Sequence, residues 1–410
     1  MANPFVVSRS LAPEHRRMLG LLGVASFFEG YDLNVLLVAL PQIRETFDLS
    51  KASASRWLIA LFLGALPAIF VARFADRIGR RRVLVITIAG YLVATGATAA
   101  APTMAVFVMC QFVSRLFLSA ENSVVWTVIA EELPPESRGY GFGWLALMSA
   151  TGTGLCALLY GSVFSAFDWS WRGLYLVGLA PVALLAYARR SLPESRQYEQ
   201  ARDTEVLATS WRAILAPERR RLLLLVCTTS VLGALASQAG VFIVDFMESV
   251  RGLSQTEATN VLVIAGALAL PVLMRAGGAS DRWGRKRVGC TFAIGGAIAS
   301  VAGFYLARGP LWLAVSLTFS LAGSFGSWPT LGGMVTELFP TSVRAQATAW
   351  TGASRVVGQA LSFWFASLIL GASSDNQPLT AAILTLGPVL AVLIIARFVP
   401  ETKGTTLAHT

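Results

Sequence analysis

Long apolar runs recur along almost the whole chain, and they limit the folds open to it. Each run is about 20 residues long, the length that an α-helix needs to cross the hydrocarbon core of a bilayer. Twelve runs are present, at about 18–40, 54–73, 83–101, 105–130, 139–163, 171–190, 221–247, 257–276, 288–307, 311–336, 345–370 and 380–398. The backbone of a lipid-embedded segment must satisfy its own hydrogen bonds, so each run is predicted to be a helix. The sequence therefore predicts an all-α integral membrane fold with twelve transmembrane helices.

Composition and charge agree with this class of protein. The 410 residues are 55% hydrophobic and only 14% charged, whereas a soluble chain carries about 25% charged residues. The net charge is +10, but most Lys and Arg fall on one side of the predicted membrane. This asymmetry follows the positive-inside rule and predicts that both termini are cytosolic, in an inner or plasma membrane. It also argues against a nucleic-acid partner.

Three landmarks of the chain recur at half its length. DRIGRRRV at 76–83 returns as DRWGRKRV at 281–288, 205 residues later. The segment from Glu132 to Arg138 returns as Glu337 to Arg344, and PES at 193–195 returns as PET at 400–402. Such spacing indicates two homologous six-helix halves. The predicted parts are an N-terminal bundle at 1–190, a cytosolic linker at 191–220, a C-terminal bundle at 221–400 and a cytosolic tail at 401–410.

The paired DRxGRR-type loops, with the PES and PETKG ends, resemble the major facilitator superfamily over the whole chain. The GYD of FFEGYD at 27–32 is most similar to the aromatic-acid and metabolite proton symporters of that family. This resemblance implies that two pseudo-symmetric bundles rock around a midplane site. Because one chain already contains both bundles, we expect it to be functional as a monomer. Two departures weigh against a sugar substrate: Trp328-Pro329 has the reverse order to sugar porters, and Gln238 stands alone where they carry a glutamine pair.

The loop signatures indicate a cytosolic gate. A carboxylate there can accept from backbone N–H groups at a helix start, where the helix dipole favours an anion, and the arginines can pair with acidic helix ends. In the family these contacts latch the cytosolic side, although anchoring of topology alone would also explain the arginines. The predicted gate residues are Asp76, Arg80, Glu132, Arg138, Asp281, Arg285, Glu337 and Arg344.

Ionisable residues inside the first half indicate proton coupling. Glu29 and Asp32 lie three residues apart in the first apolar run, and a buried carboxylate must be protonated, paired or in contact with water. Arg115 is the available cation, and in similar proton-coupled members a helix-one aspartate pairs with a helix-four arginine. Glu121 is a further candidate carboxylate. A static ion pair that fixes helix packing is the alternative.

The second half carries a different polar pattern. Ser320 occupies the position that matches Arg115, while Arg355, Gln359 and Ser362 form one stripe of a predicted helix. Because a guanidinium can hold a carboxylate with two hydrogen bonds, Arg355 is a candidate for binding an anionic substrate; the alternative is an internal pair, for example with Asp245. Asp245 lies near the outer end of its helix, where we expect water to solvate it. The candidate substrate-binding residues are Tyr31, Asn122, Gln238, Trp328, Arg355 and Gln359.

No motif in the sequence supports catalysis. There is no phosphate-binding glycine loop, metal-ligand spacing or activated nucleophile, so we expect no enzyme, no metal and no cofactor, with protons as the coupling ion. The predicted function is proton-coupled import of a small organic solute, most simply an organic anion, by alternating access. The alternatives are a proton-driven drug or metabolite exporter, favoured if Glu29 and Glu121 face a cavity, a proton-independent sugar-like facilitator, and a receptor-like member that does not transport.

Overall fold

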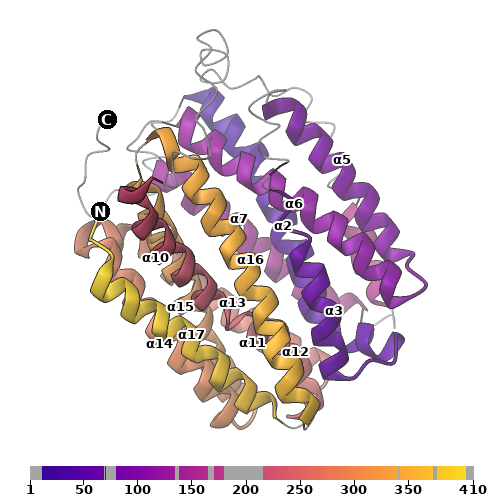
Figure 1. The fold of residues 1–410 in the computed structure, drawn as a ribbon. Coiled ribbons are helices and arrows are strands. Elements are labelled where there is room, and N and C mark those ends of the chain that lie inside the picture. The colour runs from indigo at the N-terminus through magenta and orange to yellow at the C-terminus, as the bar shows by residue number, and fades with distance from the viewer. Residues whose placement is uncertain are drawn as a thin grey trace. The chain divides into compact units, whose positions relative to one another are not determined.

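The structure is a computed structural model that describes residues 12–68, 70, 80–133, 138–164, 170–179, 216–339, 341–372 and 376–402. Regular secondary structure in these ranges is helical throughout, and each of the twelve apolar runs contains helix (Figure 1). Nine spans of the described residues are long and apolar enough to cross a membrane. The prediction of an all-α membrane fold is confirmed.

The helices follow the predicted repeat. In the first half they are α2 (Pro13–Thr46), α3 (Lys51–Leu63), α5 (Arg80–Ala99), α6 (Met104–Glu132), α7 (Arg138–Leu158) and the π-helix η2 (Leu159–Phe164). In the second half they are α10 (Pro217–Ala234), α11 (Ser237–Val241), α12 (Ile243–Ser249), α13 (Gln255–Trp283), α14 (Arg285–Tyr305), α15 (Pro310–Leu338), α16 (Thr341–Ala372) and α17 (Gln377–Phe398). Helices α5 and α14 begin 205 residues apart, and α6 and α15 each contain 29 residues.

Large apolar side chains are exposed along several of these helices. Val93 on α5 is 74% exposed and Ile298 on α14 is 65% exposed, and Leu268 and Leu393 are also exposed. Many large apolar side chains exposed in this way would be unfavourable in water but suit contact with lipid tails. The outward-facing side chains therefore support the membrane assignment independently of helix length.

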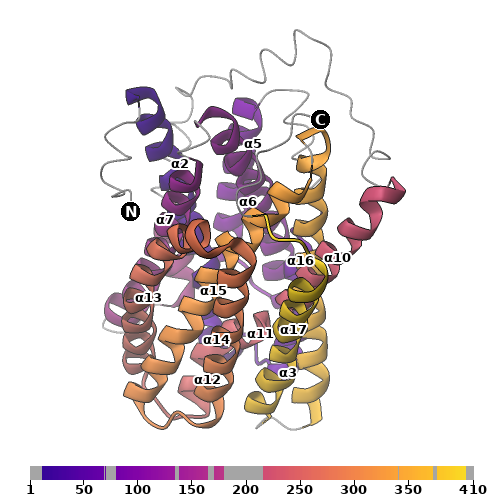
Figure 2. The same ribbon diagram turned by 90° about the vertical axis from the view of Figure 1, so that its left-hand side faces the viewer.

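The described chain forms two compact units. Unit 1 comprises Met1–Val35, Gly64–Cys156 and Trp169–Ala208, and unit 2 comprises Leu36–Leu63, Ala157–Asp168 and Thr209–Thr410. In unit 1, α5 packs along α6. In unit 2, α15 packs against α13 and α14, which lie beside it in Figure 2, and α16 packs against α3. These units reflect packing, so the predicted division at 191–220 stays a prediction, and most of that linker lies outside the described residues.

The seventh apolar run differs from the continuous helix predicted at 221–247. It is divided into α10, α11 and α12, with breaks at Leu235–Ala236 and at Phe242. Neither glycine nor proline lies at these breaks. A polar side chain of α16 binds the backbone at the first break, as described below.

The turn between α13 and α14, within the second loop signature, depends on glycine. Gly284 has φ of 99°, a conformation that L side chains rarely adopt. A Cβ atom on this residue would also meet the Glu401 carboxylate at 2.7 Å. The backbone conformation therefore favours glycine here, and a Cβ would in addition displace the Glu401 carboxylate.

We expect Gly284→Ala to lower the thermal unfolding midpoint of the detergent-solubilised protein, because the strained backbone costs about 1–3 kcal/mol. Gly266→Ala is the matched control: Gly266 lies within α13, lacks a positive φ and has open space where a Cβ would lie. The control should match or slightly exceed the wild-type midpoint, since alanine favours a helix. Equal midpoints for the two variants would contradict this account of the turn.

Candidate functional site

A close helix crossing fixes the position of the FFEGYD segment in unit 1. A Cβ on Gly30 of α2 would collide with the backbone of α7, and one on Gly152 of α7 would collide with the backbone of α2. The Thr153 hydroxyl donates to the Gly30 carbonyl at 3.2 Å, and the Asn34 amide donates to the Thr153 carbonyl at 2.9 Å. Small residues that let backbones approach are typical of membrane helix pairs. Asp32 is therefore held on a rigid backbone.

Asp32 is buried among polar residues of two other helices. Its side chain is 2% exposed and that of Arg115 on α6 is 5% exposed. The positive charge of Arg115 acts on Asp32, and Tyr91 of α5 is a side-chain hydrogen-bond neighbour of Asp32. The Oδ2 atom of Asp32 has no hydrogen-bond partner among the described residues. The structure thus brings together the predicted carboxylate and cation, and adds Tyr91, which the sequence did not single out.

Tyr31 has a packing role in the described contacts. It is 3% exposed, and its hydroxyl donates to the Leu174 carbonyl at 2.8 Å. Its ring lies beside Gly178 of the helical segment 171–179. The hydroxyl is therefore already used within the protein, although its predicted substrate contact stays a prediction.

Glu29 and Glu121 line a small cavity of unit 1 with a volume of about 20 Å³. Asn122 also lines it and donates to the Glu29 Oε1 atom at 2.6 Å. Glu121 is 6% exposed. The other residues at the cavity are Ala25, Ser26, Phe28, Ile88, Tyr91, Leu118 and Val125. Glu29 and Glu121, the two other carboxylates predicted to take part in proton coupling, thus line the same largely apolar cavity.

In unit 2, Ser362 of α16 forms hydrogen bonds with the backbone at the first break of the seventh apolar run. Its hydroxyl donates to the Leu235 carbonyl at 2.5 Å and accepts from the Gln238 backbone N–H at 3.1 Å. These two backbone groups lose their usual helical partners at the break, and non-helical backbone in a membrane is tolerated only when the protein satisfies it. The Gln238 side chain is 2% exposed, and its Oε1 atom has no hydrogen-bond partner among the described residues.

The same face of α16 carries the other predicted substrate residues. Arg355 and Gln359 are both half-buried and lie about two turns and one turn before Ser362, respectively. They are therefore placed along the helix that holds the broken segment. The side chain of Trp328 lies outside the described part of the structure.

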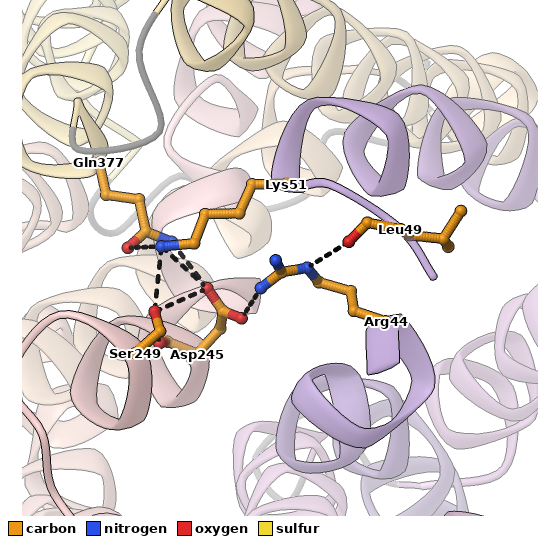
Figure 3. Close-up of polar contacts among 6 residues, drawn as sticks. All are labelled: Arg44, Leu49, Lys51, Asp245, Ser249 and Gln377. Atoms are coloured by element: carbon orange, nitrogen blue, oxygen red, sulfur yellow. Dashed lines mark hydrogen bonds and ion pairs between the residues drawn. The ribbon is translucent and has the colours of Figure 1, made fainter. Parts of the chain in front are cut away.

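Asp245 on α12 is buried, so the expectation that water solvates it is wrong. It is 1% exposed and forms ion pairs with Arg44 and with Lys51, the latter at 3.5 Å (Figure 3). The Gln377 amide donates to its Oδ2 atom at 3.0 Å. The cations come from residues about 200 positions earlier in the chain, which is why sequence position near a helix end did not reveal them. The suggested Asp245–Arg355 pair is not among the ion pairs of the described residues.

A family model described as Major Facilitator Superfamily matches residues 22–324 and 240–409. The chain belongs to the major facilitator superfamily. Members of this family are transporters, so the protein is an integral membrane transporter and not an enzyme. Its described residues contain no group of three or more His, Cys, Asp or Glu side chains placed to hold a metal ion.

Several relatives of this transporter are named after small organic solutes. A Bacillus subtilis (strain 168) protein named for niacin or nicotinamide transport is 26% identical, covering 96% of this chain and 98% of its own. The gentisate transporter of Corynebacterium glutamicum is 24% identical, covering 90% of this chain and 85% of its own. Among solved structures, a D-xylose–proton symporter matches with a TM-score of 0.78 at 20% identity, over 95% of this chain and 99% of that one. The structural match establishes the fold alone.

The predicted gate of this transporter is described only in part. Asp76 lies outside the described residues, and so do the side chains of Arg80, Arg138, Asp281, Glu337 and Arg344. The Arg285 guanidinium donates to Ser280 at 2.7 Å, and Glu132 is half-buried.

The carboxylate observed at the start of α14 belongs to Glu401 of the PETKG segment. It accepts from the backbone N–H groups of Arg285 at 2.9 Å and Lys286 at 3.1 Å. The loop aspartates are expected to act at a neighbouring helix start, which stays a prediction, whereas Glu401 shows the same favourable placement of a carboxylate at a helix start. The recurrence of PES and PET in both halves was the signal available for Glu401.

We expect Ser362→Ala to lower the unfolding midpoint and to impair transport. It leaves two buried backbone groups without a partner, at about 1–3 kcal/mol for each unsatisfied group. Ser367→Ala is the matched control on the same helix, because the Ser367 hydroxyl only donates to Trp364 within α16. Thermal unfolding and uptake should separate the two variants; a Ser362→Ala protein as stable and active as the control would rule out this role.

Proposed function

We propose that this transporter imports a small organic anion together with protons, from the outside of an inner or plasma membrane, with both termini in the cytosol and one chain as the functional unit. The observation that carries the proposal is the buried Asp32 in reach of the Arg115 charge, with one carboxylate oxygen that has no partner among the described residues. A buried carboxylate in this setting is suited to bind and release a proton.

The proton step follows from electrostatics. While Asp32 is ionised, its attraction to Arg115 is strong because little water screens the pair. A proton that binds Asp32 removes its charge and weakens that attraction, so α2 and α6 are less tightly coupled. Loss of the proton on the other side restores the attraction. This exchange links proton binding to the relative movement of helices without any other energy source.

Substrate recognition is assigned to the second half. Arg355 supplies a cation, and Gln359 and Gln238 supply amide groups near the broken span. Gentisate and niacin, named in the relatives, are both aromatic carboxylic acids, and a guanidinium is suited to bind a carboxylate through two hydrogen bonds. A small aromatic carboxylate is therefore the substrate class that we propose.

A second candidate is favoured by one specific observation. Glu29 and Glu121 line the small cavity of unit 1, and two carboxylates beside a largely apolar cavity favour a cationic ligand. This arrangement is the one expected of a proton-driven exporter. The two functions differ in the direction of proton movement, so a single assay separates them.

We expect aromatic carboxylates to acidify proteoliposomes that contain the purified protein and a pH-sensitive dye, and Asp32→Asn to reduce this acidification to the level of protein-free liposomes. Exchange of labelled carboxylate across the membrane should persist in Asp32→Asn, because asparagine resembles the protonated aspartate. Asp48→Asn removes an exposed carboxylate at the end of α2 and is the matched control. Efflux of protons driven by an organic cation would instead establish the exporter.

We expect Arg355→Gln to raise the KM for the carboxylate about 10- to 100-fold, since a charge-assisted hydrogen bond contributes about 1.5–3 kcal/mol. Arg355→Lys keeps the charge but loses the fork of donors, so its KM should lie between those of Arg355→Gln and the wild type. Arg397→Gln, on the exposed face of α17, is the matched control. An unchanged KM in Arg355→Gln would remove this residue from the substrate site.

A further inference from the structure

A polar cluster around Asp245 joins four helix ends of unit 2. Arg44 lies in the last turn of α2, Lys51 is the first residue of α3, Gln377 is the first residue of α17, and Asp245 lies on α12. Arg44 and Lys51 pair with opposite oxygens of the carboxylate, and Lys51 also donates to the Gln377 side chain at 3.2 Å (Figure 3). We call these residues the Asp245 cluster.

The charges of this cluster are largely removed from water. Asp245 is 1% exposed, and the side chains of Arg44 and Lys51 are 18% and 10% exposed. Breaking a buried pair by removing one partner is strongly unfavourable, because the remaining charge is left uncompensated. Removing the carboxylate would leave two cations close together, and they would repel. The cluster therefore strongly resists separation while it is intact.

The helix that carries Asp245 is separated from the rest of its span. Helix α12 is reached from α10 through two breaks and the five residues of α11. The Ser362 hydroxyl compensates the backbone at the first break. Next to Ser362, the Phe363 ring stacks on Phe62 of α3 with centroids 4.9 Å apart. The helical hydrogen bonds of α12 are thus separated from those of α10 by two breaks.

We infer that the Asp245 cluster is an ionic lock, which holds α12 against the ends of α2 and α3 and must separate whenever the substrate path opens on that side of the membrane. The inference rests on the proposed function, because transport by alternating access requires this side to open. Its contacts come from side chains of helix ends, where water can replace them on opening. Contacts of this kind are reversible in a way that a buried apolar interface is not.

The test measures the distance between two spin labels, one attached at Arg56→Cys on α3 and one at Val250→Cys after α12. Both positions are exposed. The labels are introduced into a transport-active protein whose four native cysteines are replaced. Without substrate, Asp245→Asn should increase the population with a longer distance about tenfold. Asp48→Asn, which removes an exposed carboxylate four residues after Arg44, should leave the distance distribution unchanged. An unchanged distribution in folded Asp245→Asn would overturn the lock.

Two further variants keep the test decisive. Lys51→Gln preserves the Arg44–Asp245 pair, so it should fold if Asp245→Asn does not and should open partially; no opening would overturn the lock. Combining Arg44→Gln, Lys51→Gln and Asp245→Asn removes the repulsion between cations, so the longer-distance population should fall below that of Asp245→Asn. An equal population would overturn the electrostatic account. No substrate or proton gradient is used, so these results are independent of those of the transport assay.

Discussion

Polar groups inside the apolar spans need partners from within the protein, and this requirement determines both halves of the candidate site. Lipid offers no hydrogen bonds, so each buried charge or broken backbone turn must be satisfied locally. Asp32 meets the requirement through Arg115 and Tyr91, Asp245 through two cations and Gln377, and the break at Leu235 through Ser362. Each of these contacts joins different helices, so a change in the charge or hydrogen bonding of one group alters the contacts of another helix.

Much of the fold could be predicted because length and periodic spacing are local properties of the sequence. Every apolar run contains helix, and α5 and α14 begin at the offset predicted by the repeated loops. The broken span could not be predicted in this way. Its local sequence favours a continuous helix, and the competing partner, Ser362, lies about 125 residues away on α16. A side chain that competes for backbone groups becomes visible only when the helices are packed.

The candidate site shows the same division between local and distant information. Asp32 and Arg115 were identifiable because an ionisable residue inside an apolar run is costly wherever its partner lies. Asp245 was misjudged because its position near a helix end suggested solvent, whereas Arg44 and Lys51 exclude water from it. Glu401 was missed because helix-start capping by a carboxylate specifies the chemistry but not which part of the chain supplies it.

The two carboxylate environments suit different tasks in one transport cycle. Asp32 has one neighbouring cation, the Tyr91 side chain as a hydrogen-bond neighbour, and an oxygen without a partner among the described residues, so adding a proton weakens a single charge–charge attraction. Asp245 is held by two cations and an amide, so adding a proton would cost it several contacts at once. A group that binds and releases protons in each cycle should have few contacts to lose, whereas a group that keeps one side closed should have many. The surroundings of the two carboxylates are therefore consistent with the proposed proton exchange at Asp32 and the proposed closure at Asp245.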